Sequence, residues 1–188
     1  MLAMTSTRTA AILCVLAASC VSTAFAAPPC DVNADVLQDT RTFAKTDNQT
    51  PWREFRSIQD LPDLSTDGGA SAQYWREKDG SPSAFVDESN EDFSIHTRYC
   101  FNNAGQLQSV GLQVRTAWGW GYRQAASVVR GQLQVDSSEF FSTTNGKPIP
   151  RPDGADDIPA ALKPVLYLTT SKLPFAALLA HFRNPGPK

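Results

Sequence analysis

Metal-ligating and nucleophilic side chains are scarce in this 188-residue chain, which has two histidines and four cysteines. The two histidines, His96 and His181, lie far apart in differently patterned segments and do not form a ligand set. No Ser-x-x-Lys, Gly-x-Ser-x-Gly, His-Glu-x-x-His or phosphate-loop motif occurs. From motifs alone we therefore assign no metal site, no cofactor and no catalytic residue.

The chain also lacks an excess of charge of either sign. It has 17 Lys and Arg residues against 19 Asp and Glu residues, a formal net charge of −2 at pH 7. Binding to nucleic acid or to an anionic membrane surface depends on a dense positive patch, which this balance does not supply. We therefore predict that neither is the partner.

No run of about 20 strongly apolar residues, the length that crosses a bilayer, is present. The apolar stretch at residues 10–21 is rich in small residues, follows a polar start with one positive side chain, Arg8, and precedes Ala24-Phe25-Ala26. This pattern is typical of a secretory signal peptide with a small-x-small cleavage site. We predict that residues 1–26 are cleaved and that the protein is periplasmic or secreted, without a membrane span.

A second interpretation of the N-terminus remains open. The segment Leu16-Ala-Ala-Ser-Cys20 resembles the processing box of a lipoprotein, in which Cys20 carries a lipid anchor. Ala17 stands where a larger aliphatic residue is usual. A lipid-anchored envelope component is therefore the lesser alternative.

After removal of residues 1–26, two cysteines remain, Cys30 and Cys100. Disulfides persist in oxidising compartments, and an even number of cysteines in an exported protein favours pairing. We predict a Cys30–Cys100 disulfide. It would close a loop of about 70 residues and, in the chain-entropy model, stabilise the fold by roughly 4 kcal/mol.

The centre of the chain alternates between apolar and polar residues. In residues 93–101 every second side chain, from Phe93 to Phe101, belongs to one apolar face, and residues 110–118 alternate in the same way. Asp79-Gly80 lies between two alternating segments, which is typical of a hairpin. Residues 122–135 fit either a strand or a helix, and we choose the strand.

Matching the apolar faces predicts the register of the hairpin around residues 102–105. A four-residue loop there pairs Phe101 with Gln106 and sets Ile95 opposite Leu112. A slip by one residue would bury His96 against Leu112, so the first register is favoured.

Apolar residues recur at helical spacing near both ends of the domain. The spacing predicts helices over residues 31–45, 156–166 and about 173–182, with a kink at Pro164. We therefore predict an α+β fold, in which a twisted antiparallel β-meander carries N-terminal and C-terminal helices packed on one face. A single domain would span residues 27–183, and residues 184–188 would be a disordered tail.

Trp118-Gly-Trp-Gly-Tyr122 is the most distinctive segment. Aromatic rings separated by glycines at a strand end can form a flat platform for a sugar or a peptide, because a rigid ring offers contact area at low entropic cost. The competing interpretation is a tight turn whose rings cap the core. Trp118, Trp120 and Tyr122 are therefore candidate ligand-binding residues.

His96 and Arg98 lie on the polar face of one predicted strand, with the carboxylates of Glu91, Asp92 or Asp87 nearby in sequence. They are candidates for an acid–base group or an anion site. The competing interpretation is a solvated sheet face, which we favour.

These patterns together predict an exported, non-enzymatic binding protein of the cell envelope or extracellular space, with a protein or glycan partner. The alternatives are a cell-envelope hydrolase that uses carboxylates and His96, and the lipid-anchored component described above.

Overall fold

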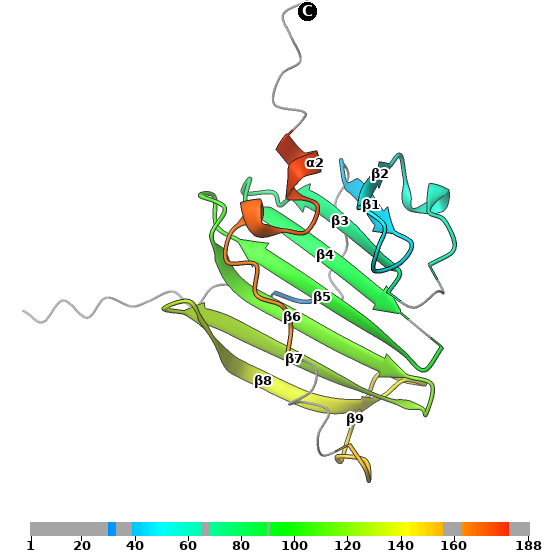
Figure 1. The fold of residues 1–188 in the computed structure, drawn as a ribbon. Coiled ribbons are helices and arrows are strands. Elements are labelled where there is room, and N and C mark those ends of the chain that lie inside the picture. Colours follow the sequence, from blue (N-terminus) through cyan, green and yellow to red (C-terminus); the bar gives the residue numbers. More distant parts are fainter. Residues whose placement is uncertain (1–29, 33–38, 65–67, 90, 156–162, 181–188) are drawn as a thin grey trace, which may run out of the picture.

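The computed structural model describes residues 30–32, 39–64, 68–89, 91–155 and 163–180. These residues form one nine-stranded antiparallel sheet in the order β2-β1-β3-β4-β5-β6-β7-β8-β9 (Figure 1). From β3 to β9 each strand pairs with the next along the chain, whereas β1 lies between β2 and β3. The strands are β1 (Arg41–Lys45), β2 (Arg53–Phe55), β3 (Ala70–Arg76), β4 (Pro82–Ser89), β5 (Phe93–Phe101), β6 (Leu107–Thr116), β7 (Trp120–Val129), β8 (Gln132–Ser142) and β9 (Pro148–Ile149).

The predicted alternation is confirmed over β5 and, in β6, as far as Thr116, and it divides the sheet into an apolar face and a polar face. Beyond Thr116 the prediction is wrong, because Trp118 lies outside the strand and is exposed. Tyr99, Val110 and Leu112 are buried on the apolar face, in line with Phe43 of β1 through the cross-strand pairs. The polar face carries His96, Arg98 and Cys100. Both faces are therefore defined by the period of two that the sequence shows.

The hairpin between β5 and β6 was predicted with the correct faces but the wrong register. Ile95 pairs with Val114, two residues beyond the expected Leu112. One residue of the shift comes from the turn, where Asn102 N–H donates to the Gln106 carbonyl and Gly105 has a φ of +75°. The other comes from a bulge beside Phe101, which pairs with Leu107 while Cys100 pairs with Ser109. Because the two shifts add up to two residues, apolar residues of β5 still lie opposite apolar residues of β6. The alternation of apolar and polar residues therefore does not distinguish the predicted register from the observed one.

The strand assignment for residues 122–135 is confirmed, because this segment belongs to β7 and β8. Arg130 and Gly131 join the two strands, and both have positive φ values, of 53° and 77°. A two-residue turn of this kind matches the right-handed twist of its flanking strands. The predicted hairpin at Asp79-Gly80 is also confirmed, with Gly80 at a φ of +85°.

The predicted N-terminal helix is wrong over its second half. Residues 41–45 are strand β1, which pairs with β2 on one side and β3 on the other. Two neighbouring strands satisfy the backbone of this short segment and bury Phe43, and that outweighs its weak helical spacing. Residues 31, 32, 39 and 40 are not helical either, and residues 33–38 lie outside the described part of the chain.

Of the two predicted C-terminal helices, the first is wrong in the part that the structure describes, and the second, predicted over about residues 173–182, is shorter there than expected. Residues 163–168 are not helical, and within the described residues 163–180 the only α-helix is the short α2 (Ala176–Ala180). Pro164 lacks the N–H that a helix needs. Instead, backbone bonds dock the segment on the β5–β6 turn: Leu107 N–H donates to the Leu168 carbonyl, and Thr170 N–H donates to Gly105. Residues 156–162 lie outside the described residues.

The C-terminal segment nevertheless covers part of the apolar face, crossing in front of the sheet in Figure 1. Phe175 stacks on Phe43 with ring centroids 4.5 Å apart, and the Tyr167 ring lies 5.3 Å from that of Tyr99. The fold is therefore a nearly all-β sheet with a largely irregular C-terminal cover, in place of the expected helices on one face.

Candidate functional site

Trp118 lies at the tip of the turn between β6 and β7. It is the middle residue of the three-residue connection 117–119, in which Gly119 has a φ of +86°. Its side chain is 63% exposed, and its ring stacks on that of Trp120 with a centroid distance of 6.2 Å and an interplanar angle of 30°. We call Trp118 and Trp120 the aromatic turn.

Trp120 and Tyr122 connect this turn to the core. Trp120 is half-buried and meets the Phe140 ring edge-on at 5.9 Å, while Tyr122 is buried and lies 5.2 Å from the same ring. The Tyr122 hydroxyl donates to Gln124 Oε1 at 2.9 Å. The structure therefore gives Tyr122 a packing role, whereas Trp118 presents its ring to solvent. A ligand role for these residues stays a prediction.

The neighbouring loops hold the aromatic turn in place. Ala117 N–H donates to the Asp92 carbonyl in the β4–β5 loop, at 2.9 Å. Thr143 N–H, in the turn between β8 and β9, donates to the Gly119 carbonyl at 3.0 Å. The Thr116 hydroxyl donates to the Trp120 carbonyl at 2.6 Å. The exposed Trp118 ring is thus carried by a backbone that is hydrogen-bonded to the loops on both sides of it.

His96 lies on the polar face in β5, with its ring 5.5 Å from that of Phe85. Its Nε2 is 3.6 Å from Oδ1 of Asp87, the residue opposite it in β4. Both side chains are partly exposed, at 26% and 35%. The structure therefore brings His96 close to Asp87, one of the three carboxylates suggested by the sequence, at a distance longer than a hydrogen bond.

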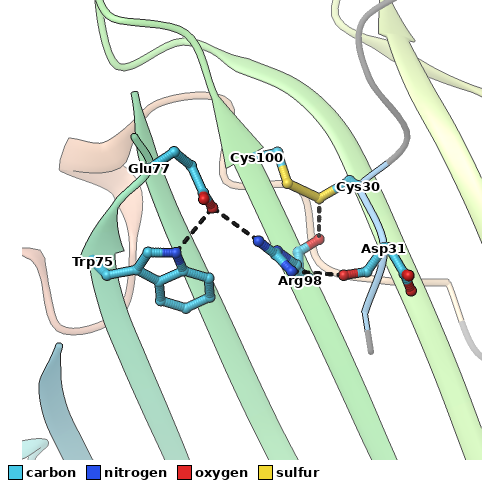
Figure 2. Close-up of a disulfide and its surroundings, with 6 residues drawn as sticks. All are labelled: Cys30, Asp31, Trp75, Glu77, Arg98 and Cys100. Carbon is cyan, nitrogen blue, oxygen red and sulfur yellow. Dashed lines mark hydrogen bonds and ion pairs between the residues drawn. A yellow bond between two sulfur atoms is a disulfide. The ribbon is translucent and has the colours of Figure 1, made fainter. Parts of the chain in front are cut away.

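Arg98, two residues along the same face, has a different environment. Its side chain is only 7% exposed, and its guanidinium lies 5.0 Å from the centre of the Trp75 ring. Nη2 donates to Glu77 Oε1 at 2.8 Å, and Nη1 donates to the Asp31 carbonyl at 2.7 Å (Figure 2). Arg98 therefore joins β3, β5 and the N-terminal segment, whereas His96 faces Asp87 of β4.

Glu77 is the anionic partner in this cluster. Its Oε1 also accepts a hydrogen bond from Trp75 Nε1 at 2.9 Å. Burial by itself would raise the pKa of Glu77, but the Ser83 hydroxyl, Arg98 and Trp75 together outweigh burial and lower the pKa below its usual value. Sequence analysis missed Trp75 and Glu77, although alternation places Trp75 on the face that carries Arg98.

The predicted disulfide between Cys30 and Cys100 is confirmed. It fixes residues 30–32 to the polar face beside Arg98, as Figure 2 shows. The Cys30 sulfur lies 3.5 Å from the Arg98 carbonyl oxygen, and the Cys30 carbonyl lies over Gly111. We call residues 30–32 the N-terminal strap.

A hollow of about 330 Å³ lies beside this strap on the polar face. Its floor includes the small residues Gly111, Ala125 and Ser137, which are paired across β6, β7 and β8. Arg123 and Glu139 line it as well, joined by an ion pair of 2.7 Å. Neither His96 nor Arg98 lines this hollow, so the sequence-predicted polar pair does not open into it.

A smaller hollow, of about 150 Å³, lies on the apolar face under the C-terminal segment. Tyr99, Tyr167 and Glu88 line it together with aliphatic side chains. Burial, reinforced by the negative charge of Glu88, raises the pKa of both tyrosines, so they are neutral hydroxyl groups at ordinary pH.

Within the described ranges, no three His, Cys, Asp or Glu side chains gather as a metal site would require. No helix in those same ranges has the length and apolar character needed to span a membrane. Comparison of the chain with protein-family models, curated proteins and solved structures finds no match.

Proposed function

We propose that this chain is an exported, non-enzymatic binding protein of the cell envelope or extracellular space, and that it recognises its partner through the aromatic turn. The Cys30–Cys100 disulfide supports export, because such bonds persist in oxidising compartments. The observation that carries the binding role is the 63% exposure of Trp118 on top of Trp120.

Exposure alone would be a weak argument, since single apolar residues are common on protein surfaces. The backbone that carries Trp118 is also fixed in position, which single exposed residues do not require. The backbone on each side of the turn is hydrogen-bonded to a different loop, at 2.9 Å and 3.0 Å. A ring held in place before binding loses little conformational freedom when a partner covers it, so more of its contact energy is available for affinity.

A pull-down from cell-envelope extract tests this function. The immobilised protein should retain a partner, and Trp118→Ala should retain at least about tenfold less, as expected for loss of a central aromatic contact of 1.4 kcal/mol or more. Ile58→Ala is the matched control, because Ile58 is a large apolar residue with 53% exposure that lies in a different part of the fold. Equal recovery with wild type and Trp118→Ala would remove the aromatic turn as the recognition surface.

A hydrolase remains the second candidate, and it is favoured by one observation, the approach of His96 Nε2 to Asp87 at 3.6 Å. A histidine beside a carboxylate can act as a general base. The hydrolase function would be supported if the wild type releases products from envelope polysaccharide or peptide substrates and His96→Gln does not. Activity that is absent, or unchanged in His96→Gln, would reject this candidate.

The lipid-anchored alternative concerns Cys20, which lies outside the described residues. The mass of the mature N-terminus distinguishes the two interpretations. Cleavage after Ala26 gives a chain that begins at Ala27, whereas anchoring gives one that begins at an acylated Cys20.

A further inference from the structure

We propose that the ligand of the aromatic turn is a neutral polysaccharide, bound by stacking of a pyranose ring on Trp118. This inference rests on the proposed function and names the class of ligand for the same surface.

The indole rings of Trp118 and Trp120 form an offset, tilted stack in which Trp118 is the exposed ring. Their planes differ by 30° and their centroids are 6.2 Å apart, while the far edge of Trp120 rests on Phe140. Trp120 therefore supports Trp118 from the core side and leaves the outer face of Trp118 to solvent. A pyranose with equatorial hydroxyls presents a flat face of C–H groups, and a flat aromatic ring with a negative face complements it.

The apolar area at this site is narrow. The exposed large aliphatic residues of β7 and β8, Val129 and Val135, lie far from Trp118, toward the Arg130-Gly131 turn at the opposite end of these strands. A stable protein interface buries about 800 Å² on each partner around an apolar centre, which one exposed ring does not provide. A single sugar ring needs only a platform of its own size, so the site fits a glycan better than a folded protein.

Short polar side chains stand on both sides of the platform. Glu91 and Asp92 are exposed in the loop to which Ala117 is bonded, and Thr144 and Asn145 are exposed in the turn to which Gly119 is bonded. Carboxylate, hydroxyl and amide groups are the donors and acceptors that match the hydroxyls of a sugar. Arg115, which donates to the Thr143 carbonyl, and Lys147 are exposed beside the second turn. They offset the acidic pair on the other side, so the surface has no excess charge to attract an ionic polysaccharide, which is why we infer a neutral one.

Affinity gel electrophoresis with soluble neutral polysaccharides tests this proposal. The probes are a mixed-linkage β-glucan, a galactomannan and a xyloglucan, with bovine serum albumin as the non-binding reference. Wild type should be retarded by at least one of them, with quenching of tryptophan fluorescence. Trp118→Ala should lose at least tenfold in affinity, Trp118→Phe should lose less because a ring remains, and Ile58→Ala should bind as wild type does.

Unfolding curves of the three variants exclude loss of the fold as the cause, because Trp118 and Ile58 are exposed and their replacement should leave the midpoint unchanged. If no probe retards the wild type, or if Trp118→Ala is retarded equally, the polysaccharide proposal is wrong.

The envelope pull-down separates this failure from failure of the proposed function. Trp118-dependent capture of a protein that survives glycosidase treatment, without retardation by any polysaccharide, keeps the binding function and replaces the glycan with a protein partner. Loss of Trp118 dependence in both experiments removes both proposals.

Discussion

The carbonyl oxygen of Cys30 occupies the space in which a β-carbon at Gly111 would lie. Gly111 is in the middle of β6, paired with Arg98 of β5 and Ala125 of β7. It is not among the glycines with positive φ, so its lack of a side chain serves the close approach of the N-terminal strap and not an unusual backbone conformation.

Substitution of Gly111 by alanine should therefore destabilise the protein. The methyl group has to displace backbone atoms of Cys30, and overpacking of this kind costs about 1–3 kcal/mol. Urea denaturation measures the change in the free energy of unfolding. Ser137→Ala is the control, because Ser137 lies in the same cross-strand row but is exposed on β8.

The cause can be checked with a double-mutant cycle. In a Cys30→Ser/Cys100→Ser background the strap is no longer covalently joined to β5, although the hydrogen bond from Arg98 to the Asp31 carbonyl remains. It can then move away from position 111 more readily, and the penalty of Gly111→Ala should shrink. The same penalty in both backgrounds would contradict this contact as its cause.

Loss of the disulfide alone should also lower stability. Cys30 and Cys100 are 70 residues apart in sequence. The chain-entropy model assigns roughly 4 kcal/mol to closing a loop of this length. Guanidinium denaturation of the wild type with and without reductant should show this difference, and the Cys30→Ser/Cys100→Ser variant should match the reduced wild type. A difference below about 1 kcal/mol would contradict the model.

The ion pair between Arg98 and Glu77 should make stability depend on pH. The pKa of Glu77 is lowered from its ordinary value of 4.5 in the folded state, so the folded protein binds this proton less readily than the unfolded chain does. The stabilisation is complete above pH 4.5 and is lost as the pH falls through the lowered folded-state pKa. Denaturation midpoints between pH 7 and pH 3 should therefore fall in the wild type.

Glu77→Gln should be less stable than the wild type at pH 7, because the buried Arg98 loses its anionic partner. The difference in stability between Glu77→Gln and the wild type should become smaller toward pH 3, where Glu77 is protonated in the wild type as well. Glu91→Gln, at an exposed loop position, is the control and should follow the wild-type curve. A constant gap across the whole pH range would show that the Glu77 charge does not stabilise the fold.

The C-terminal segment should contribute strongly to stability although it contains little helix. Phe175 is 1% exposed, stacks on Phe43 at 4.5 Å and lies 5.6 Å from Trp52. Phe175→Ala should cost about 3–5 kcal/mol, as is usual for a buried phenylalanine. Leu168→Ala, at a 44% exposed position of the same segment, should change stability by no more than about 0.5 kcal/mol. Equal effects in thermal unfolding would contradict this assignment of the core contact.

The sheet could be predicted from the sequence wherever its signal was local. Alternation over residues 93–101 and glycine at a turn report the conformation of the residues that carry them, and both were confirmed. The register of β5 with β6 was not, because the turn and the bulge at Phe101 each shift the pairing by one residue and leave the faces unchanged.

The helices predicted over residues 41–45 and 163–166 were wrong because the conformation of these residues depends on distant partners. Residues 41–45 become a strand because β3 supplies its hydrogen bonds, and Leu168 and Thr170 dock on a turn that lies more than sixty residues earlier. Spacing of apolar residues within a segment does not report such partners.

The candidate site divides in the same way. Alternation over residues 110–118 places Trp118 on the apolar face, whereas β6 ends at Thr116 and Trp118 is 63% exposed in the turn. The glycines indicated a turn but not the residue at which the strand ends. The environment of Arg98 does not follow from its strand, because the groups that bury it come from Trp75, Glu77 and the N-terminal strap. The alternation of β5 predicts the face on which Arg98 lies. The N-terminal strap that covers its side chain is held there by the Cys30–Cys100 disulfide.

The position of the disulfide has a practical consequence for handling the protein. Cys100 stands near the end of β5 that is remote from Phe93, and Phe93 pairs with Thr116 at the base of the aromatic turn. From Phe93 to Cys100 the strand rises about 23 Å. A fusion partner or biotin placed ahead of Cys30 thus joins the folded domain at a distance from Trp118, which favours N-terminal attachment when the protein is fixed to a sensor chip or a bead.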